Sequence, residues 1–260
     1  IDEKTLNIDP NKIERLNTEN TVAIMPVHVY GNNCDISRIE KIAKNNNLKV
    51  IYDAAHAIGS IYKGRSVLEF GDISATSLHA TKILNTAEGG GCITTNSKLN
   101  DKLKRIRFFG HNQSKDDIIE DGFNGKMTEV HAALGLANIK YFDEILSDRI
   151  LKYQIYYNGL RINKDLSFQE VKFGQSNSSY FPVIFKDEKQ LLHIQKVLNE
   201  NNIFPRRYFF PSVNLFSNIY KYHKCIISEN IANRILCLPL YYELEESKIS
   251  KIIDLVNESL

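Results

Sequence analysis

Four side chains have the types that covalent chemistry with an aldehyde cofactor requires. Lys82 is a lone amine in a polar stretch, Ser77 precedes it, and Asp53 and His56 lie upstream. A deprotonated lysine can attack an aldehyde, and a carboxylate can keep a pyridine nitrogen protonated, so that the ring draws electrons. Ser77 could bind a phosphate, and His56 could stack on the ring or donate to its phenolic oxygen. Together the four residues predict pyridoxal phosphate chemistry.

Each of these residues also has an ordinary explanation when it is taken alone. A lone loop lysine such as Lys82 is usually a solvated charge, and Asp53 could be a helix N-cap. His56 could be a half-buried structural histidine, and Ser77 an ordinary hydroxyl at the end of a strand. Only the combination favours a cofactor site.

Short strands must position these side chains. Residues 48–52 form an apolar run that ends at Asp53, and residues 73–78 form a second run before Lys82. Three glycines after Glu88 lead into a third β-type run at residues 92–95. The pattern therefore places the amine on a loop between two strands, downstream of a carboxylate at a strand end.

The segment upstream predicts a parallel α/β arrangement. A strand is expected at residues 22–29, where Pro26 suits a bulge or a strand end. Asp35 then precedes an apolar stripe at helical spacing, and the strand that ends at Asp53 follows. Such a strand-helix-strand unit implies a right-handed crossover, and ligands of these sheets bind beyond the carboxyl ends of the strands.

The remaining elements follow from periodicity and turn residues. We expect a short helix at 11–16, a turn at 62–65 and a polar loop at 111–125. Longer helices are expected at residues 98–107, 128–137 and 143–160. From residue 179 the pattern indicates a small α+β domain, with a strand at 180–185, a helix at 188–200, an extended segment at 203–210 and a last helix at 247–260.

The run PRRYFFP at residues 205–211 combines two guanidinium groups with aromatic rings. Arg206, Arg207 and Tyr208 could bind a nucleotide diphosphate or a sugar. The alternative is an aromatic strand packed on the core with surface arginines.

Composition is that of a globular protein. The chain has 260 residues, of which 43% are hydrophobic and 25% charged, with a net charge of +2. Charges of both signs are interspersed, so no nucleic-acid or membrane surface is indicated. The four cysteines lack CxxC spacing, which favours reduced thiols in a cytoplasm, and the seven histidines do not cluster as metal ligands, so no metal is expected.

Five ordered segments resemble the DegT/DnrJ/StrS-type nucleotide-sugar aminotransferases. They are PVHVYG at 26–31, VIYDAAHAIGSIYKGR at 50–65, GDISATSLHATK at 71–82, EGGGCITTN at 88–96 and GFNGKMTEVHAALGLANI at 122–139. The resemblance implies that Lys82 binds pyridoxal 5'-phosphate through a Schiff base, Asp53 pairs with its pyridine nitrogen and His56 stacks on its ring. It further implies that Ser77 binds the phosphate and that Asn124 reaches the phosphate of a neighbouring subunit.

The resemblance implies the fold and the reaction as well. We expect fold type I of the pyridoxal phosphate enzymes, with a large domain at 1–150 and a small α+β domain at 151–260. The expected reaction moves an amino group, from glutamate, to a nucleotide-linked keto-6-deoxy sugar for a surface polysaccharide such as O-antigen. His28, Tyr30, Arg206, Arg207 and Tyr208 are the expected substrate contacts. A cytoplasmic homodimer with a shared site is expected.

Three alternatives were weighed, of which two remain at this point. The chain begins at IDEKTLNIDPNKIERL, which resembles the middle of a family domain, so a fragment or an inactive or regulatory homologue is possible. A sugar dehydratase on the same scaffold is a second alternative, although such enzymes resemble this family with histidine in place of the lysine, and Lys82 is present. A Rossmann dinucleotide enzyme is excluded, because no G-x-G-x-x-G follows a first strand.

Overall fold

The structure is a computed structural model that describes residues 1–216, 218–219 and 221–260. The chain folds into two compact units. One unit, the sheet unit, contains Pro10–Asp143 and Phe173–Ser176. The other, the C-terminal unit, contains Ile1–Asp9, Glu144–Lys172 and Asn177–Leu260. Within the described residues no helix is long and apolar enough to cross a bilayer.

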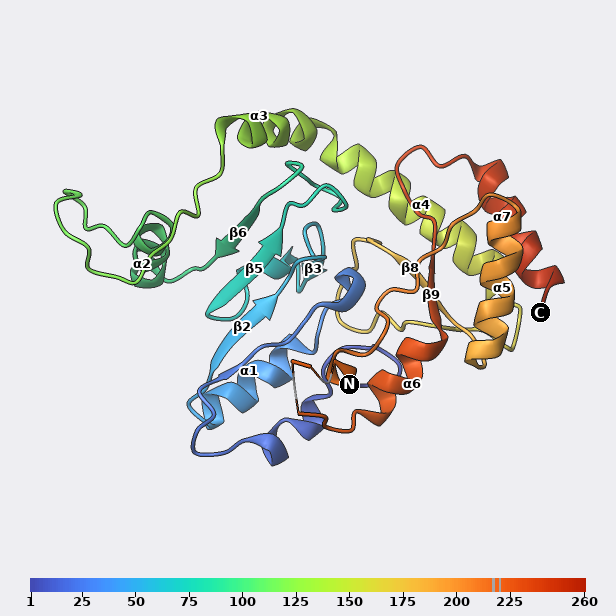
Figure 1. Cartoon of the computed structure of the whole chain (residues 1–260), viewed down its shortest axis with the longest axis horizontal. Helices are drawn as coiled ribbons and strands as arrows, with labels where there is room; N and C mark the ends of the chain where they lie inside the picture. The colour runs from blue at the N-terminus through green and yellow to red at the C-terminus, as the bar shows by residue number, and fades with distance from the viewer. Residues whose placement is uncertain (217, 220) are drawn as a thin grey trace. The chain divides into compact units, whose positions relative to one another are not determined.

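A mixed four-stranded sheet forms the centre of the sheet unit (Figure 1). Its order is β1 (Ala23–Ile24), β2 (Lys49–Asp53), β5 (Ile73–Ser77) and β6 (Gly90–Ile93). The first three strands run parallel, and β6 pairs antiparallel with β5. The expected strand at 22–29 is therefore short. It is interrupted after Ile24, and a single bridge from Val27 to Asp53 continues the pairing.

Helix α1 (Ile36–Asn45) covers β2 as the apolar stripe predicts. The Asp35 carboxylate caps its first turn by accepting from the Arg38 amide at 3.2 Å. Its buried side chains are Ile36, Ile39, Ile42 and Ala43. The expected helix and its cap are confirmed, because the side chains that repeat at helical spacing are those that the sheet buries.

The expected turn at 62–65 is a hairpin of β3 (Ile61–Tyr62) and β4 (Arg65–Ser66). A distant segment, Phe173–Ser176, packs against it. The side-chain nitrogen Nδ2 of Asn33 donates to the backbone carbonyls of Ile61 at 2.9 Å and Phe173 at 2.7 Å. The segment therefore belongs to the sheet unit although its neighbours in sequence do not.

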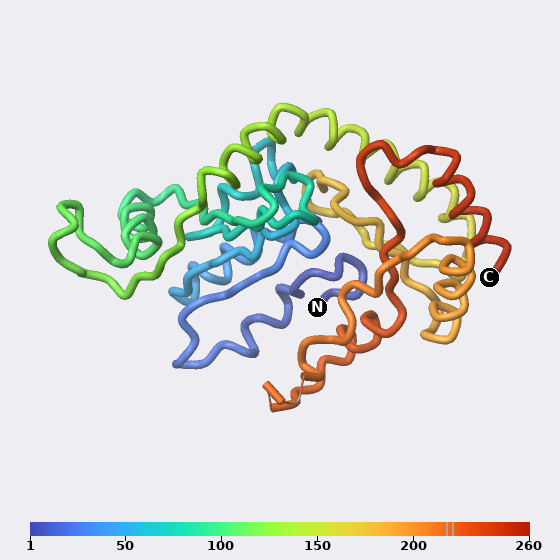
Figure 2. Tube along the Cα trace, turned by 45° about the horizontal axis from the view of Figure 1, so that its top comes forward, coloured from blue at the N-terminus to red at the C-terminus, as the bar shows by residue number. Residues whose placement is uncertain are grey.

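Two helices complete the sheet unit. They are α2 (Ser97–Arg107), capped by Asn96, and α3 (Glu129–Asn138), capped by Thr128. In both views the green segment that contains α2 and the following loop extends away from the four-stranded sheet (Figures 1 and 2). Helix α3 contains no buried residue and exposes Val130 and Leu136.

The C-terminal unit is built on an antiparallel sheet with the order β7 (Ser167–Phe168), β8 (Phe181–Ile184) and β9 (Ile235–Leu238). Its helices are α4 (Phe142–Leu160), α5 (Glu188–Glu200), α6 (Ile226–Arg234) and α7 (Glu246–Glu258). One core fills the space between them, formed by apolar side chains of β8, β9, α4, α5 and α7. The unit combines strands and helices, and α5 has the bounds that the sequence predicted.

Short 3-10 helices connect these elements. They are η1 (Pro10–Lys12), η2 (Glu14–Leu16), η3 (Val29–Gly31), η4 (Val67–Glu69), η5 (Ile139–Tyr141) and η6 (Val213–Leu215). The expected helix at 11–16 is in fact the pair η1 and η2.

Candidate active site

Asp53 is the last residue of β2, where two backbone bonds to the segment 26–28 fix it. Its amide donates to the Pro26 carbonyl at 2.9 Å, and its own carbonyl accepts from the His28 amide at 3.0 Å. Its carboxylate atom Oδ1 accepts from the Ala55 amide at 3.0 Å. The sheet therefore holds a half-buried carboxylate at the carboxyl end of a parallel strand, where ligands of such sheets bind.

His56 lies just beyond this strand end and is 8% exposed. Burial lowers the pKa of His56 to about 4, and the charge of Lys82 lowers it in the same direction. The imidazole is therefore neutral at physiological pH.

Lys82 is half-buried on the loop between β5 and β6. Its amide donates to the His79 carbonyl at 2.9 Å, which closes a tight turn. Burial lowers the pKa of Lys82, and the carboxylate of Asp53 opposes part of that shift. Because β2 and β5 are parallel neighbours, Asp53 and the loop that carries Lys82 lie at the same edge of the sheet, and His56 follows Asp53 by three residues.

Ser77 is the last residue of β5 and pairs with Gly90 of β6. Its Oγ accepts from the His79 amide at 3.2 Å. The hydroxyl hydrogen can then be donated to an anion, because the oxygen and not the hydrogen is used in this bond. Ser77 thus stands where the strand enters the Lys82 loop.

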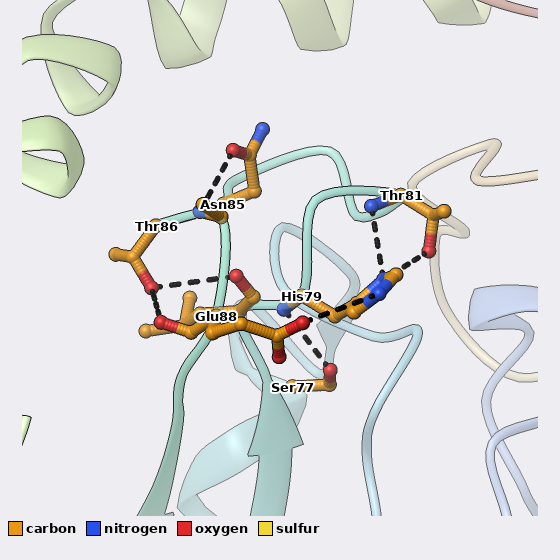
Figure 3. A network of polar contacts seen from close by, with 8 residues as sticks. Ser77, His79, Thr81, Asn85, Thr86 and Glu88 are labelled. Carbon is orange, nitrogen blue, oxygen red and sulfur yellow. Dashed lines mark hydrogen bonds and ion pairs between the residues drawn. The ribbon is translucent and has the colours of Figure 1, made fainter. Parts of the chain in front are cut away.

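A polar network inside the loop sets its shape (Figure 3). The imidazole Nδ1 of His79 lies 3.0 Å from Thr81 Oγ1, and Nε2 lies 3.7 Å from a carboxylate oxygen of Glu88. The buried hydroxyl of Thr86 donates to the Glu88 carbonyl at 2.7 Å. Reasoning from the sequence assigned no role to these residues, although their position around Lys82 could have drawn attention to them.

Helix α3 supports the loop from outside. The side-chain nitrogen Nδ2 of Asn138 donates to the backbone carbonyl of Asn85 at 2.9 Å. A Cβ on Gly135 would lie 2.7 Å from the Thr86 methyl group, so glycine permits this close approach. A Cβ on Gly89 would lie 2.5 Å from Thr86 Oγ1, which explains a glycine directly after Glu88. The second half of the loop, around Asn85 and Thr86, thus packs against α3.

Asn124 lies on the exposed loop that follows α2, where its backbone bridges to Phe108. This position is open to another molecule. Its expected contact with a neighbouring subunit's phosphate stays a prediction.

His28 is completely buried, and this corrects the expectation that it contacts the substrate. Its ring stacks on Tyr52 with centroids 4.7 Å apart, and its Nδ1 accepts from the Cys34 amide at 3.1 Å. Burial lowers the pKa of His28 to about 3. Tyr30, with 4% exposed, is also part of the packed interior and has a positive φ of 59°. We therefore omit both residues from the proposed substrate contacts.

The three residues of the PRRYFFP run belong to the C-terminal unit and differ in their surroundings. Arg206 is exposed. Arg207 forms an ion pair with Glu188 at 2.7 Å, and its guanidinium lies 3.5 Å from the centroid of the Phe210 ring. Tyr208 packs on Tyr180, with ring centroids 5.4 Å apart. Arg207 therefore has a structural role, whereas Arg206 can still contact a ligand.

The site of the sheet unit fits pyridoxal phosphate. It offers an amine whose pKa is lowered by burial, a carboxylate at a strand end and a neutral imidazole. Ser77 adds a hydroxyl that can donate to a phosphate. These are the groups that would bind the aldehyde, the pyridine nitrogen, the ring face and the phosphate of this cofactor. Fold and site together define a pyridoxal phosphate-dependent enzyme of fold type I.

The comparison with known families agrees. The model of the DegT/DnrJ/EryC1/StrS aminotransferase family matches residues 1–257, and the chain belongs to this family. A curated relative from Shigella dysenteriae, a dTDP-4-amino-4,6-dideoxy-D-glucose transaminase, is 40% identical over 255 residues. That alignment covers 95% of this chain and 69% of the relative.

Solved structures show the same fold. DesI, crystallised in the presence of its TDP-sugar product, is 27% identical with a TM-score of 0.89, covering 99% of this chain and 67% of DesI. NtdA from Bacillus subtilis, crystallised with the cofactor PMP, is also 27% identical and has a TM-score of 0.87. That match covers 100% of this chain and 61% of NtdA. The expected family, fold class and cofactor are therefore confirmed.

Proposed function

We propose that this chain transfers an amino group from glutamate to a dTDP-linked 4-keto-6-deoxy sugar. The observation that carries the proposal is that Asp53 and the loop with Lys82 follow the carboxyl ends of two adjacent parallel strands, β2 and β5. Overall, glutamate becomes 2-oxoglutarate and the keto group of the sugar becomes an amine. Pyridoxal phosphate, when bound, supplies the aldehyde that carries the amino group and a ring that draws electrons from the reacting carbon.

Lys82 has two tasks in this proposal. Its amine holds the cofactor covalently until the amino donor takes its place. The released amine then removes the proton from the α-carbon of glutamate and delivers a proton to C4′ of the cofactor. Attack on the aldehyde and removal of the α-proton both need the neutral amine, and burial favours that form by lowering the pKa of Lys82. The ammonium formed by that removal then supplies the proton that is delivered.

Asp53 and His56 hold the cofactor for this proton transfer. One carboxylate oxygen of Asp53 is fixed by the Ala55 amide, which leaves the other to keep a proton on the pyridine nitrogen. The ring of His56, which burial keeps neutral, would lie against the face of the pyridine. Ser77 would anchor the phosphate from the end of β5, so that Lys82 and the phosphate ligand lie on one loop.

The choice of substrate is supported by the relative from Shigella dysenteriae, whose name describes a dTDP-linked sugar with its amine at C4. DesI, which was crystallised with a TDP-sugar product, supports the same nucleotide class. In this chain the exposed guanidinium of Arg206 is the proposed contact for the diphosphate, with Tyr208 beside it. The product would enter the synthesis of a surface polysaccharide such as O-antigen.

A homodimer and a cytoplasmic location are part of the proposal. The exposed loop that carries Asn124 is where one subunit would reach the phosphate of the other. The four cysteines are free thiols, as is common in a reducing compartment.

A transamination assay tests the reaction. Purified protein with pyridoxal phosphate and glutamate is given dTDP-4-keto-6-deoxy-D-glucose, and the amino sugar and 2-oxoglutarate are measured by mass spectrometry. We expect equal amounts of both products from wild type, none from Lys82→Ala, and unchanged rates from Lys98→Ala, which alters an exposed lysine on α2. Product formation by Lys82→Ala at the wild-type rate contradicts the proposal. Amination of a 3-keto sugar in preference to the 4-keto isomer contradicts the proposed substrate alone.

A further inference from the structure

His79 has a polar neighbour at each of its ring nitrogens although 47% of its side chain is exposed. Nδ1 lies 3.2 Å from the Thr81 amide nitrogen and 3.0 Å from Thr81 Oγ1. Nε2 faces the Glu88 carboxylate on the other side of the ring, as Figure 3 shows. An exposed histidine without such contacts would change rotamers freely. This ring instead has one orientation beside the cofactor lysine.

The contacts determine which nitrogen carries the proton. A backbone amide can only donate, so Nδ1 must accept from the Thr81 amide and must be unprotonated. The proton of the neutral ring is therefore on Nε2, which faces Glu88. Thr81 Oγ1 lies 3.0 Å from the same Nδ1 and can share its lone pair with the amide. A second proton on Nδ1 would break the bond to the Thr81 amide.

The backbone of His79 joins the two ends of the site. Its amide donates to Ser77 Oγ at 3.2 Å, and its carbonyl accepts from the Lys82 amide at 2.9 Å. The side chain fixes Thr81, the residue directly before Lys82. One residue thus connects the hydroxyl that would bind the phosphate with the turn that presents the amine.

We propose that His79 is a positioning residue for the aminotransferase reaction. As the neutral Nε2–H tautomer it fixes the turn from residue 79 to 82 and so directs the Lys82 amine toward the cofactor aldehyde. Glu88 stabilises this tautomer by facing the Nε2–H group. The inference rests on the proposed function, because it assigns His79 a task in the same site, and it requires no contact between His79 and the substrate.

The tautomer is tested in the protein without cofactor. Nitrogen NMR of protein labelled at histidine distinguishes a protonated Nε2 from a protonated Nδ1. Hydrogen exchange reports whether the Thr81 amide is bonded. We expect the Nε2–H form near pH 8 and slow exchange at Thr81 that becomes fast in His79→Ala. An Nδ1–H tautomer, or equal exchange rates at Thr81 in both proteins, would overturn the inference.

Two variants of matched size test the positioning role in the protein loaded with pyridoxal phosphate. Asparagine can place its amide oxygen near the position of Nδ1, whereas glutamine places its amide near the position of Nε2. Because a neutral hydrogen bond changes an equilibrium by roughly 3- to 10-fold, we expect His79→Gln to weaken cofactor retention by that factor. His79→Asn should stay within about 2-fold of wild type, since it keeps the acceptor for the Thr81 amide.

The outcomes separate this inference from the proposed function. Retention is measured by dialysis, followed by borohydride reduction and mass spectrometry of the peptide that contains Lys82. If wild type forms no adduct, the proposed function fails and the inference fails with it. If wild type forms the adduct and the two variants behave alike, with or without loss, the inference fails alone. The inference is supported if His79→Gln retains less cofactor than wild type while His79→Asn retains about as much as wild type.

Discussion

Acid should destabilise the sheet unit through His28, which the fold buries as a neutral ring. Desolvation lowers its pKa to about 3, whereas an exposed histidine has a pKa of 6.5. Between these two values the unfolded chain binds a proton that the folded chain does not. The free energy of unfolding therefore falls as the pH falls from about 6.5 toward 3. For this pair of pKa values the loss at pH 5, relative to pH 8, is about 2 kcal/mol from His28 alone.

The assay compares wild type with His28→Asn. Asparagine can offer an amide oxygen to the Cys34 amide in place of Nδ1, but it does not titrate. It loses the stack on Tyr52, so the variant should be less stable than wild type at pH 8. Hydrogen exchange of the Asp53 amide, which is bonded to the Pro26 carbonyl, reports the unfolding of this unit.

The test depends on how the free energy of unfolding changes with pH, and not on its value at any one pH. His56, whose pKa burial lowers to about 4, should destabilise both proteins by a similar amount in acid. The difference between wild type and His28→Asn should therefore shrink by about 2 kcal/mol from pH 8 to pH 5. A difference that stays constant over this range would refute the reasoning, because it would show that His28 titrates normally in the folded protein.

Three further substitutions have definite expected results. Asp53→Asn should lower the pKa of Lys82 further, because the Asp53 carboxylate raises that pKa in wild type. The pH dependence of Lys82 acylation should therefore move to lower pH. An unchanged pH profile would contradict the assigned interaction. Asp148→Asn leaves the buried amine of Lys152 without its ion-pair partner at 2.5 Å and should cost about 3 kcal/mol in urea unfolding. Most of that loss should return in Asp148→Asn/Lys152→Met, and a double variant as unstable as the single one would contradict the explanation. Gly135→Val should displace the loop that carries the cofactor lysine and slow cofactor capture, whereas capture at the wild-type rate would show that α3 does not support the loop.

The local elements of the fold could be predicted from the sequence because their signals are local. Asp35 ahead of a helical stripe predicted α1, and Asp187 caps α5 where the apolar spacing begins. The strand ends at Asp53 and Ser77 followed from short apolar runs. Since parallel strands share one carboxyl edge, the topology then brought Lys82 close to Asp53.

Long-range contacts explain what the sequence did not indicate. Phe173–Ser176 joins the sheet unit because Asn33 and Ile61 bond to it, and no periodicity predicts such a pairing. His28 is a polar residue in an apolar segment, and only the fold shows that its ring is buried and stacks on Tyr52. Likewise, only the fold shows that Arg207 has Glu188 as a partner.

The most direct test of the account is to identify the residue that captures the cofactor. The protein is incubated with pyridoxal phosphate, reduced with borohydride and digested, and the modified peptide is sequenced by mass spectrometry. The account predicts one phosphopyridoxyl group, on Lys82, which is absent in Lys82→Ala and weakened in Asp53→Ala. A reduced adduct on another lysine, with Lys82 unmodified, would contradict the central claim that the loop between β5 and β6 presents the cofactor amine.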